Sequence, residues 1–217
     1  MHPPPPPPSR RRNFRCRGYT SSPLMVENAK DRMAYKPPHI DERAITIKGP
    51  HPATLEDAVL LKQCEIDTGR VSGPGGQNRN KVDTAVWIKH VPTEIETHAT
   101  ERRSQSQNRH VAIFRLRLKL ACKVRTITNR DGHQPSELWK LRRQGEKLPI
   151  NPENHDYPAL LSEAMDVVTA RRFDVAGSAG ILGITMSQLT RLIRHERHAF
   201  ALVNAGREAT GLAQLRK

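Results

Sequence analysis

Cysteines, aromatic residues and long apolar runs are all scarce in this chain of 217 residues. The three cysteines, Cys16, Cys64 and Cys122, lie far apart and form no Cys-x-x-Cys pair. This argues against a disulfide framework or a zinc site and predicts a reducing compartment. The ten histidines are scattered: His195 and His198 share a helical face, but no third ligand lies at metal-binding spacing. No apolar run approaches the ~20 residues of a membrane helix. We therefore expect no metal, no cofactor and no membrane partner.

Positive charge is abundant, and it is unevenly distributed. The formal net charge is +14. Residues 1–25 contribute +5 and residues 101–147 contribute +9, whereas residues 26–100 contribute −1 and residues 148–217 contribute +1. Two concentrated basic segments are typical of a protein that binds a phosphate backbone. For the second segment, a solvated basic helix is the alternative.

Residues 1–53 are predicted to form a Pro- and Arg-rich, largely disordered N-terminal region. Six consecutive prolines favour polyproline II and do not start a helix. An acid-free, Arg-rich composition is also found in organellar transit peptides, although the prolines argue against their amphipathic helix. We expect a cytoplasmic protein, with the mitochondrial matrix as the alternative. Within this region, Ile45-Thr46-Ile47 predicts a short strand.

Residues 54–125 have the pattern of a small mixed domain. Thr54 followed by Asp57 predicts an N-cap and an acidic first turn for a short helix that ends at Leu61. Residues 64–68 then predict a strand that leads into a glycine-rich segment.

A hairpin is predicted after the glycine-rich segment. Apolar residues alternate with exposed ones over 86–90, a turn follows at Pro92-Thr93-Glu94, and a second strand covers 95–99. Residues 101–124 fit two patterns, because 115–120 alternate strictly as in a strand. Apolar residues also recur at helical spacing, and no helix breaker interrupts the segment. We therefore predict a long basic helix with a broad apolar face.

Residues 126–157 are predicted to be a basic, loop-like linker, because Asn129–Gly132 forms a turn signal and Pro149 and Pro152 prevent a long helix. Trp139 lies among Lys and Arg residues in this linker. Its ring either stacks on a base or anchors the linker in the core.

Residues 158–217 are predicted to form a small all-helical module. Within it, residues 179–193 resemble a helix-turn-helix with its turn at Gly183. Three apolar residues would form the inner face of the second helix. The outer face would show polar groups able to meet phosphates or base edges: Ser187, Gln188, Thr190, Arg191 and Arg194. A packing module without nucleic-acid contact is the alternative.

The segment Gly73-Pro74-Gly75-Gly76-Gln77 carries the strongest chemical signal. Three glycines in four positions allow tight turns, positive φ and close approach to a ligand. The uncharged amide of Gln77 supplies both donors and an acceptor. Such a loop can hold backbone N–H groups and one amide against a small reacting centre.

The residues around this loop extend the pattern. Asn78, Asn80 and Thr84-Ala85-Val86 follow it, and a later block spans Glu101 to Arg109. Over residues 55–125, this combination resembles the Gly-Gly-Gln domain of class I peptide chain release factors. The departures are Val71 in place of a small residue, Arg79 in place of an aliphatic residue, and Pro92-Thr93-Glu94 in place of Pro-Thr-Gly.

The resemblance implies an α+β fold and a specific reaction. The fold is a small domain of residues 54–125, in which a β-hairpin or sheet packs on a long basic helix, followed by the helix-turn-helix-like module. The reaction is hydrolysis of the ester between a nascent peptide and tRNA on the ribosome. The implied catalytic residues are Gly75, Gly76 and Gln77, supported by Gly73, Pro74 and Asn80. The implied RNA-binding residues are Arg70, Arg79, Lys81, Arg102, Arg103, Ser104, Gln105, Asn108, Arg109, Arg115 and Arg117.

Two further expectations concern specificity and partners. Only about seventy residues precede Gly73, mostly Pro-rich and irregular, and no stop-codon-reading domain fits among them. We therefore expect codon-independent rescue of stalled ribosomes by a monomer that contacts large-subunit rRNA and peptidyl-tRNA. The alternative from another class is a non-catalytic RNA- or DNA-binding protein that acts through the helix-turn-helix.

Overall fold

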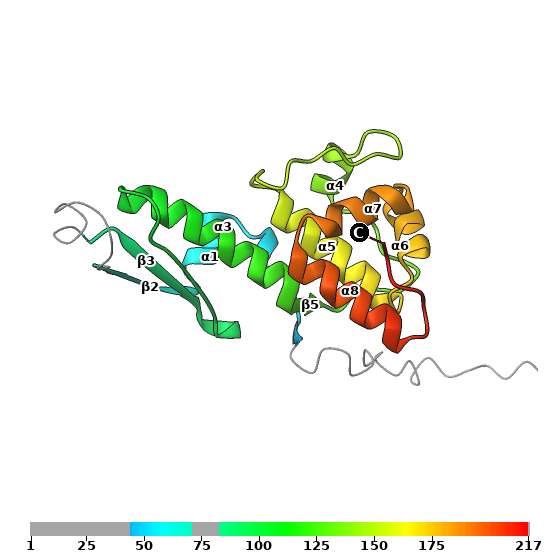
Figure 1. Ribbon diagram of the computed structural model, residues 1–217, viewed down its shortest axis with the longest axis horizontal. Helices are drawn as coiled ribbons and strands as arrows, with labels where there is room; N and C mark the ends of the chain where they lie inside the picture. Colours follow the sequence, from blue (N-terminus) through cyan, green and yellow to red (C-terminus); the bar gives the residue numbers. More distant parts are fainter. Residues whose placement is uncertain (1–43, 71–82, 217) are drawn as a thin grey trace, which may run out of the picture. The chain divides into compact units, whose positions relative to one another are not determined.

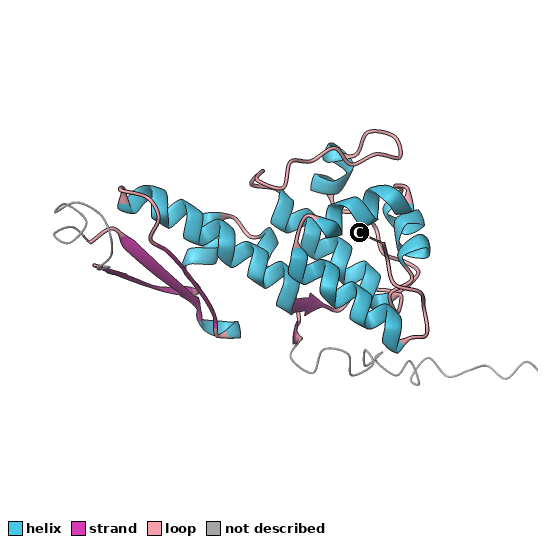
Figure 2. Cartoon of the chain, viewed as in Figure 1, coloured by secondary structure: helices cyan, strands magenta, loops and turns pink. Residues whose placement is uncertain are grey.

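A small antiparallel sheet flanks the glycine-rich segment in the computed structural model, which describes residues 44–70 and 83–216 (Figures 1 and 2). The strands are β2 (Cys64–Gly69), β3 (Ala85–His90) and β4 (Ile95–Ala99), in the order β2-β3-β4. Val86 and Ile88 are buried whereas Trp87 between them is exposed, as strand alternation requires. The predicted strand before the loop and the predicted hairpin are confirmed.

The hairpin turn uses a backbone conformation that glycine adopts more easily than other residues. A 3-10 turn, η2 (Val91–Thr93), is followed by Glu94 at a φ of 55°. This is the position at which the sequence departs from Pro-Thr-Gly. The left-handed conformation is therefore kept without glycine, at a cost of about 1 kcal/mol.

One long helix covers the inner face of the sheet. This helix, α3 (Gln105–Lys123), packs against β3 and β4, and it also packs against α5 of the helical region (Figure 1). Ala112, Leu116 and Leu120 are fully buried at intervals of four residues, which is helical spacing. The helical interpretation of residues 101–124 is confirmed, and the strand-like alternation over 115–120 is coincidental.

A parallel strand pair, a 3-10 turn and a short helix pack beside α3. The pair is β1 (Ile45–Ile47) with β5 (Val124–Thr126), and the predicted strand at 45–47 is confirmed. The predicted N-cap at Thr54 is wrong. Thr54 ends a 3-10 turn, η1 (Pro52–Thr54), and its hydroxyl donates to the carbonyl of His51 at 2.7 Å. Helix α1 (Asp57–Leu61) starts after Glu56 instead.

His51 is a buried link between η1 and β5. Its Nδ1 accepts a hydrogen bond from the Ala53 amide at 3.0 Å, and its Nε2 lies 3.2 Å from the Val124 carbonyl oxygen. The ring therefore donates through Nε2 and is neutral. Burial lowers the pKa of His51 to about 4.

We expect this histidine to make the protein sensitive to acid. The unfolded chain takes up the histidine proton near its ordinary pKa of about 6.5, whereas the folded chain resists it until about 4. Stability is therefore present above the unfolded pKa and is lost as the pH falls. Between about pH 7 and about pH 5, wild type should lose about 2 kcal/mol more unfolding free energy than His51→Gln.

Denaturant titrations at the two pH values measure this difference directly. Asp166 opposes the effect, because burial raises its pKa to about 6 and acid therefore favours its folded form. Both proteins contain Asp166, so its contribution cancels in the comparison. Equal pH dependence of the two proteins would contradict the assignment to His51.

The C-terminal half is helical. After the short helix α4 (Glu137–Arg142), it consists of α5 (Tyr157–Ala170), α6 (Val175–Leu182), α7 (Met186–Arg194) and α8 (Arg197–Ala209). The α+β fold is confirmed: a small sheet and a long helix precede a helical region. Helix α4 lies where a loop-like linker was expected, because Ser136 caps it and accepts from the Trp139 amide at 3.1 Å.

The two regions share apolar contacts. α3 packs on α5, and buried residues of both helices belong to one continuous cluster. The division at residues 126–157 stays a prediction. Within residues 44–70 and 83–216, no helix is both long enough and apolar enough to cross a membrane.

Candidate functional site

The base of the glycine-rich loop is closed by an ion pair. Arg70 follows β2, Asp83 precedes β3, and the Arg70 Nε lies 2.9 Å from the Asp83 carboxylate. Strand pairing extends to Gly69 opposite Ala85, so the two ends of the loop lie side by side. The loop itself, with Gly73, Pro74, Gly75, Gly76, Gln77, Arg79, Asn80 and Lys81, lies outside the described residues.

Asn108 fastens the C-terminal end of the loop to α3. Its Nδ2 donates to the Thr84 carbonyl at 2.7 Å and to the Arg102 carbonyl at 2.9 Å. Its Oδ1 accepts from the Arg102 amide at 2.8 Å. Asn108 itself is fully buried. Asn108 therefore fixes the start of β3 and the turn before α3 together.

Gln105 adds a second contact to the same strand end. Its Nε2 donates to the Asp83 carbonyl at 3.0 Å, and its side chain is exposed. Gln105 and Asn108 were both expected at an RNA surface. Gln105 remains accessible, whereas Asn108 is buried and saturated with internal hydrogen bonds. The sequence could have indicated the burial of Asn108 through helical spacing. Asn108 lies four and eight residues before Ala112 and Leu116, which are buried on the same side of α3.

The exposed cations of the second motif block lie around the start of α3. Arg102, Arg103 and Arg109 are exposed, and none forms an ion pair with any described residue. Ser104 is also exposed, at the N-cap position of α3. Arg115 lies further along and is already engaged: it pairs with Glu101 at 2.7 Å and donates to the His98 carbonyl at 3.0 Å. The hydrogen bond from Arg115 lowers the pKa of Glu101.

Arg117 has a different place from the one expected, because it is buried inside the fold. Its side chain is 3% exposed and lies 2.6 Å from the Asp57 carboxylate. It also donates to the carbonyls of Ala53, at 3.1 Å, and Leu55. A guanidinium enclosed in this way cannot reach a phosphate. Arg117 instead ties η1 and α1 to α3.

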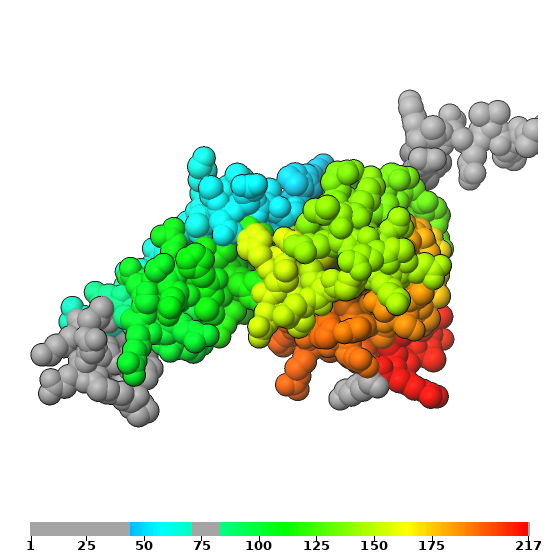
Figure 3. All heavy atoms as spheres, turned by 90° about the horizontal axis from the view of Figure 1, so that it is seen from above, coloured from blue at the N-terminus to red at the C-terminus, as the bar shows by residue number. Residues whose placement is uncertain are grey.

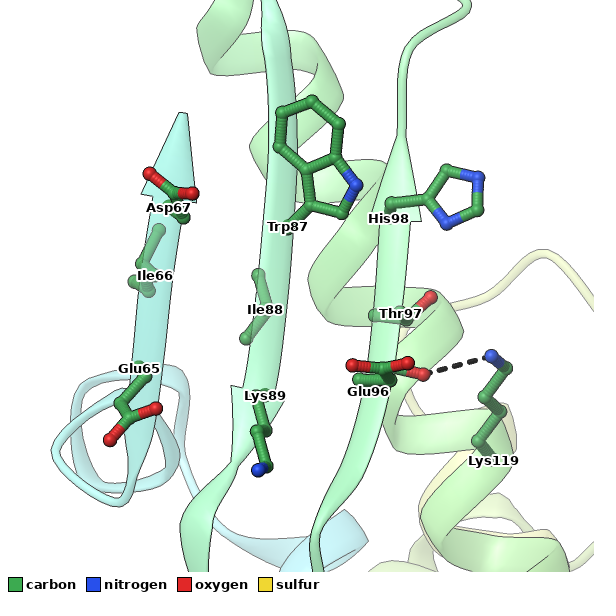
Figure 4. A pocket seen from close by; sticks show the side chains of 10 residues that line it. All are labelled: Glu65, Ile66, Asp67, Trp87, Ile88, Lys89, Glu96, Thr97, His98 and Lys119. Atoms are coloured by element: carbon green, nitrogen blue, oxygen red, sulfur yellow. Dashed lines mark hydrogen bonds between the residues drawn. The ribbon is translucent and has the colours of Figure 1, made fainter. Parts of the chain in front are cut away.

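The outer face of the sheet forms an open pocket of about 450 Å³ that no sequence pattern indicated (Figure 4). Trp87 lines this pocket and lies over Gly69 of the neighbouring strand, because a Cβ added at Gly69 would be 3.2 Å from the indole ring. Charged residues alternate across the strands below it, since Lys89 is paired with Glu65 on one side and Glu96 on the other. Such cross-strand charge pairs stabilise a sheet.

Trp139 is an anchor and not an exposed base-stacking platform. Its side chain is fully buried, and its Nε1 donates to the Leu182 carbonyl at 2.9 Å. Leu182 ends α6, immediately before Gly183, whose φ of 66° forms the turn into α7. Trp139 therefore fastens α4 to the turn between α6 and α7.

Comparison with known proteins shows which part of this chain resembles a known family. Residues 56–147 match the RF-1 domain. "Peptide chain release factor 1, mitochondrial" of Bos taurus is 35% identical over 103 residues, which are 46% of this chain and 22% of that protein. "Peptide chain release factor 1" of Chlorobaculum tepidum is 58% identical over 55 residues, or 25% of this chain and 15% of that protein.

A third relative is "Peptide chain release factor 1-like, mitochondrial" of Rattus norvegicus. It is 42% identical over 71 residues, which are 33% of this chain and 19% of that protein. The chain thus spans about a fifth of the length of the curated relatives that it matches. The matched region includes the loop, the sheet, α3 and α4.

Proposed function

Because this chain belongs to the class I peptide chain release factor family through its RF-1 domain, we propose that it hydrolyses peptidyl-tRNA on the ribosome. The observation that supports the proposal is that the residues on both sides of the Gly-Gly-Gln segment are held in place, by the Arg70–Asp83 ion pair and by Asn108. The family match spans the Gly-Gly-Gln segment together with the sheet and helix that hold both of its ends.

In the proposed reaction, a water oxygen attacks the ester carbonyl carbon, and the bond from that carbon to the 3′ oxygen of tRNA breaks. By resemblance to the family, the backbone N–H of Gln77 donates to the leaving oxygen, and the Gln77 side chain orients the water. An amide is essentially non-basic, so proton transfer falls to the tRNA or rRNA. The protein supplies position and hydrogen bonds.

The described residues support this division of roles. Gly75, Gly76 and Gln77 would act from a segment whose flanking residues are held by the Arg70–Asp83 pair and by Asn108. Holding the residues that flank a reacting segment in fixed positions is one source of catalytic rate.

Ribosome binding is proposed to use the free cations at the start of α3. Arg102, Arg103 and Arg109 are exposed and carry no internal ion pair among the described residues, so their guanidinium groups are available to rRNA phosphates. Ser104 and Gln105 lie in the same segment and add neutral donors. We propose that the protein acts as a monomer, in a cytoplasmic or mitochondrial compartment where translation occurs.

The finer proposal is release without a stop codon. The described residues before the Gly-Gly-Gln segment, 44–70, are used inside the domain as β1, η1, α1 and β2, and this supports the proposal. We expect comparable release from ribosomes whose decoding site holds a stop codon, a sense codon or no codon. The measurement is single-turnover release of a labelled peptide from each complex. A strong requirement for the stop codon would restrict the protein to termination and would leave the hydrolysis itself intact.

A further inference from the structure

The basic linker and the helix-turn-helix meet at one surface. The Thr185 amide donates to the Glu146 carbonyl at 3.1 Å, and Arg143 Nη1 donates to the Gly183 carbonyl at 3.2 Å. Gln188 of α7 lies close to Leu148, whose amide is 3.5 Å from its Oε1. The linker atoms, in yellow-green, lie against the orange helical segment in Figure 3. Residues far apart in the sequence therefore share one face.

This face is strongly positive, although the helical module alone is nearly neutral. Residues 138–150 and 183–195 together hold six Lys and Arg residues and a single acidic residue, Glu146. Lys140 and Arg142 are paired with Glu137 and Asp156. The other four have no ion-pair partner within the described part of the chain: Arg143, Lys147, Arg191 and Arg194.

Helix α7 presents its polar side to this face. Its inner side is buried through Leu189, Leu192 and Ile193. Ser187, Arg191 and Arg194 are all exposed, and their spacing of four and then three residues places them in one row. Guanidinium and hydroxyl groups in a row suit the oxygen atoms of consecutive phosphates.

We propose that this face, defined by Arg143, Lys147, Ser187, Arg191 and Arg194, binds the phosphate backbone of structured RNA. Charge complementarity carries the proposal, since four unpaired cations on one face match a polyanion. The choice of RNA over DNA rests on the proposed function, which brings the protein to rRNA. The face thus provides a contact separate from the catalytic loop and from the start of α3.

The test measures binding of the full chain to a fluorescein-labelled RNA hairpin over a potassium chloride series. The variant is Arg191→Gln/Arg194→Gln, in which both side chains are exposed and the fold should be unaffected. The matched control is Arg130→Gln/Arg216→Gln, which removes the same charge from two exposed positions elsewhere. Thermal unfolding of both variants verifies that they are folded.

The α7 variant should bind the hairpin about tenfold more weakly. Its plot of log affinity against log salt should become shallower by up to about 2 units, about 0.9 for each phosphate contact as measured on duplex DNA. The control should keep the wild-type slope. Unchanged affinity and slope in the α7 variant would overturn the proposal. If polyglutamate displaced the labelled hairpin as well as unlabelled RNA does, the partner would be an acidic protein and not RNA. Stronger binding to duplex DNA than to RNA would overturn the choice of RNA.

Peptide release separates this proposal from the catalytic one. If wild type releases no peptide yet loses hairpin affinity on substitution of Arg191 and Arg194, the catalytic proposal fails and the RNA face stands. If wild type releases peptide and the α7 variant binds the hairpin normally, the RNA face fails and catalysis stands.

Discussion

Replacing Gly76 by alanine is expected to slow peptide release by about 100-fold or more while leaving ribosome binding nearly unchanged. A Cβ at this position restricts φ and occupies space where the loop must approach the ester. Small displacements of a reacting group cost on the order of 100-fold in rate. The measurement is single-turnover release at saturating factor concentration, together with ribosome affinity.

Gly180→Ala is the matched control for this variant. Gly180 lies in α6, and a Cβ there would have no described heavy atom within 4 Å. Adding a methyl group to a helical glycine should leave release unchanged and stabilise the fold by up to about 1 kcal/mol. Release by Gly76→Ala at the rate of the control would remove the glycine-rich loop from the catalytic mechanism.

Asn108→Ala is expected to have the largest effect among the described residues. It removes the hydrogen bonds to Thr84 and to both backbone groups of Arg102, three in all. At about 1 kcal/mol for each bond, the free energy of unfolding should fall by about 3 kcal/mol. Release should also slow at temperatures where the variant remains folded, because the C-terminal end of the loop is no longer fixed.

The control for Asn108 is its neighbour on the same helix. Gln107 is exposed, so Gln107→Ala should change stability by no more than about 0.5 kcal/mol. Denaturant unfolding and release are measured on both variants. Loss of stability without slower release in Asn108→Ala would mean that Asn108 supports the fold but does not position the loop.

The local structure was largely predictable because short-range patterns determine it. Alternation around Trp87 predicted the hairpin, and the helical spacing of Val111, Phe114, Leu118 and Cys122 predicted α3. The side that is most deeply buried is the neighbouring one, with Ala112, Leu116 and Leu120. The N-cap at Thr54 was mispredicted because His51 and Pro52 form a 3-10 turn first. In that turn, the Thr54 hydroxyl donates to His51 rather than accepting from a helix. A cap motif read from residue type alone cannot include that competition.

The roles of buried polar residues were not predictable from local sequence. Arg117 appears among Arg and Lys residues that face solvent, yet its partner Asp57 is sixty residues earlier in the chain. Trp139 likewise depends on Leu182, 43 residues later. Such partners become visible only when the elements are packed. The basic face around Arg143 and Arg191 was hidden for the same reason, since its halves belong to separate segments.

The most direct test is release by the wild-type protein. Ribosomes loaded with labelled peptidyl-tRNA are mixed with an excess of the full chain, and free peptide is measured over time against ribosomes alone. We predict release well above the background rate, and its loss in Gly76→Ala but not in Gly180→Ala. Binding to the same ribosomes with no release above background would contradict the proposal that this protein hydrolyses peptidyl-tRNA.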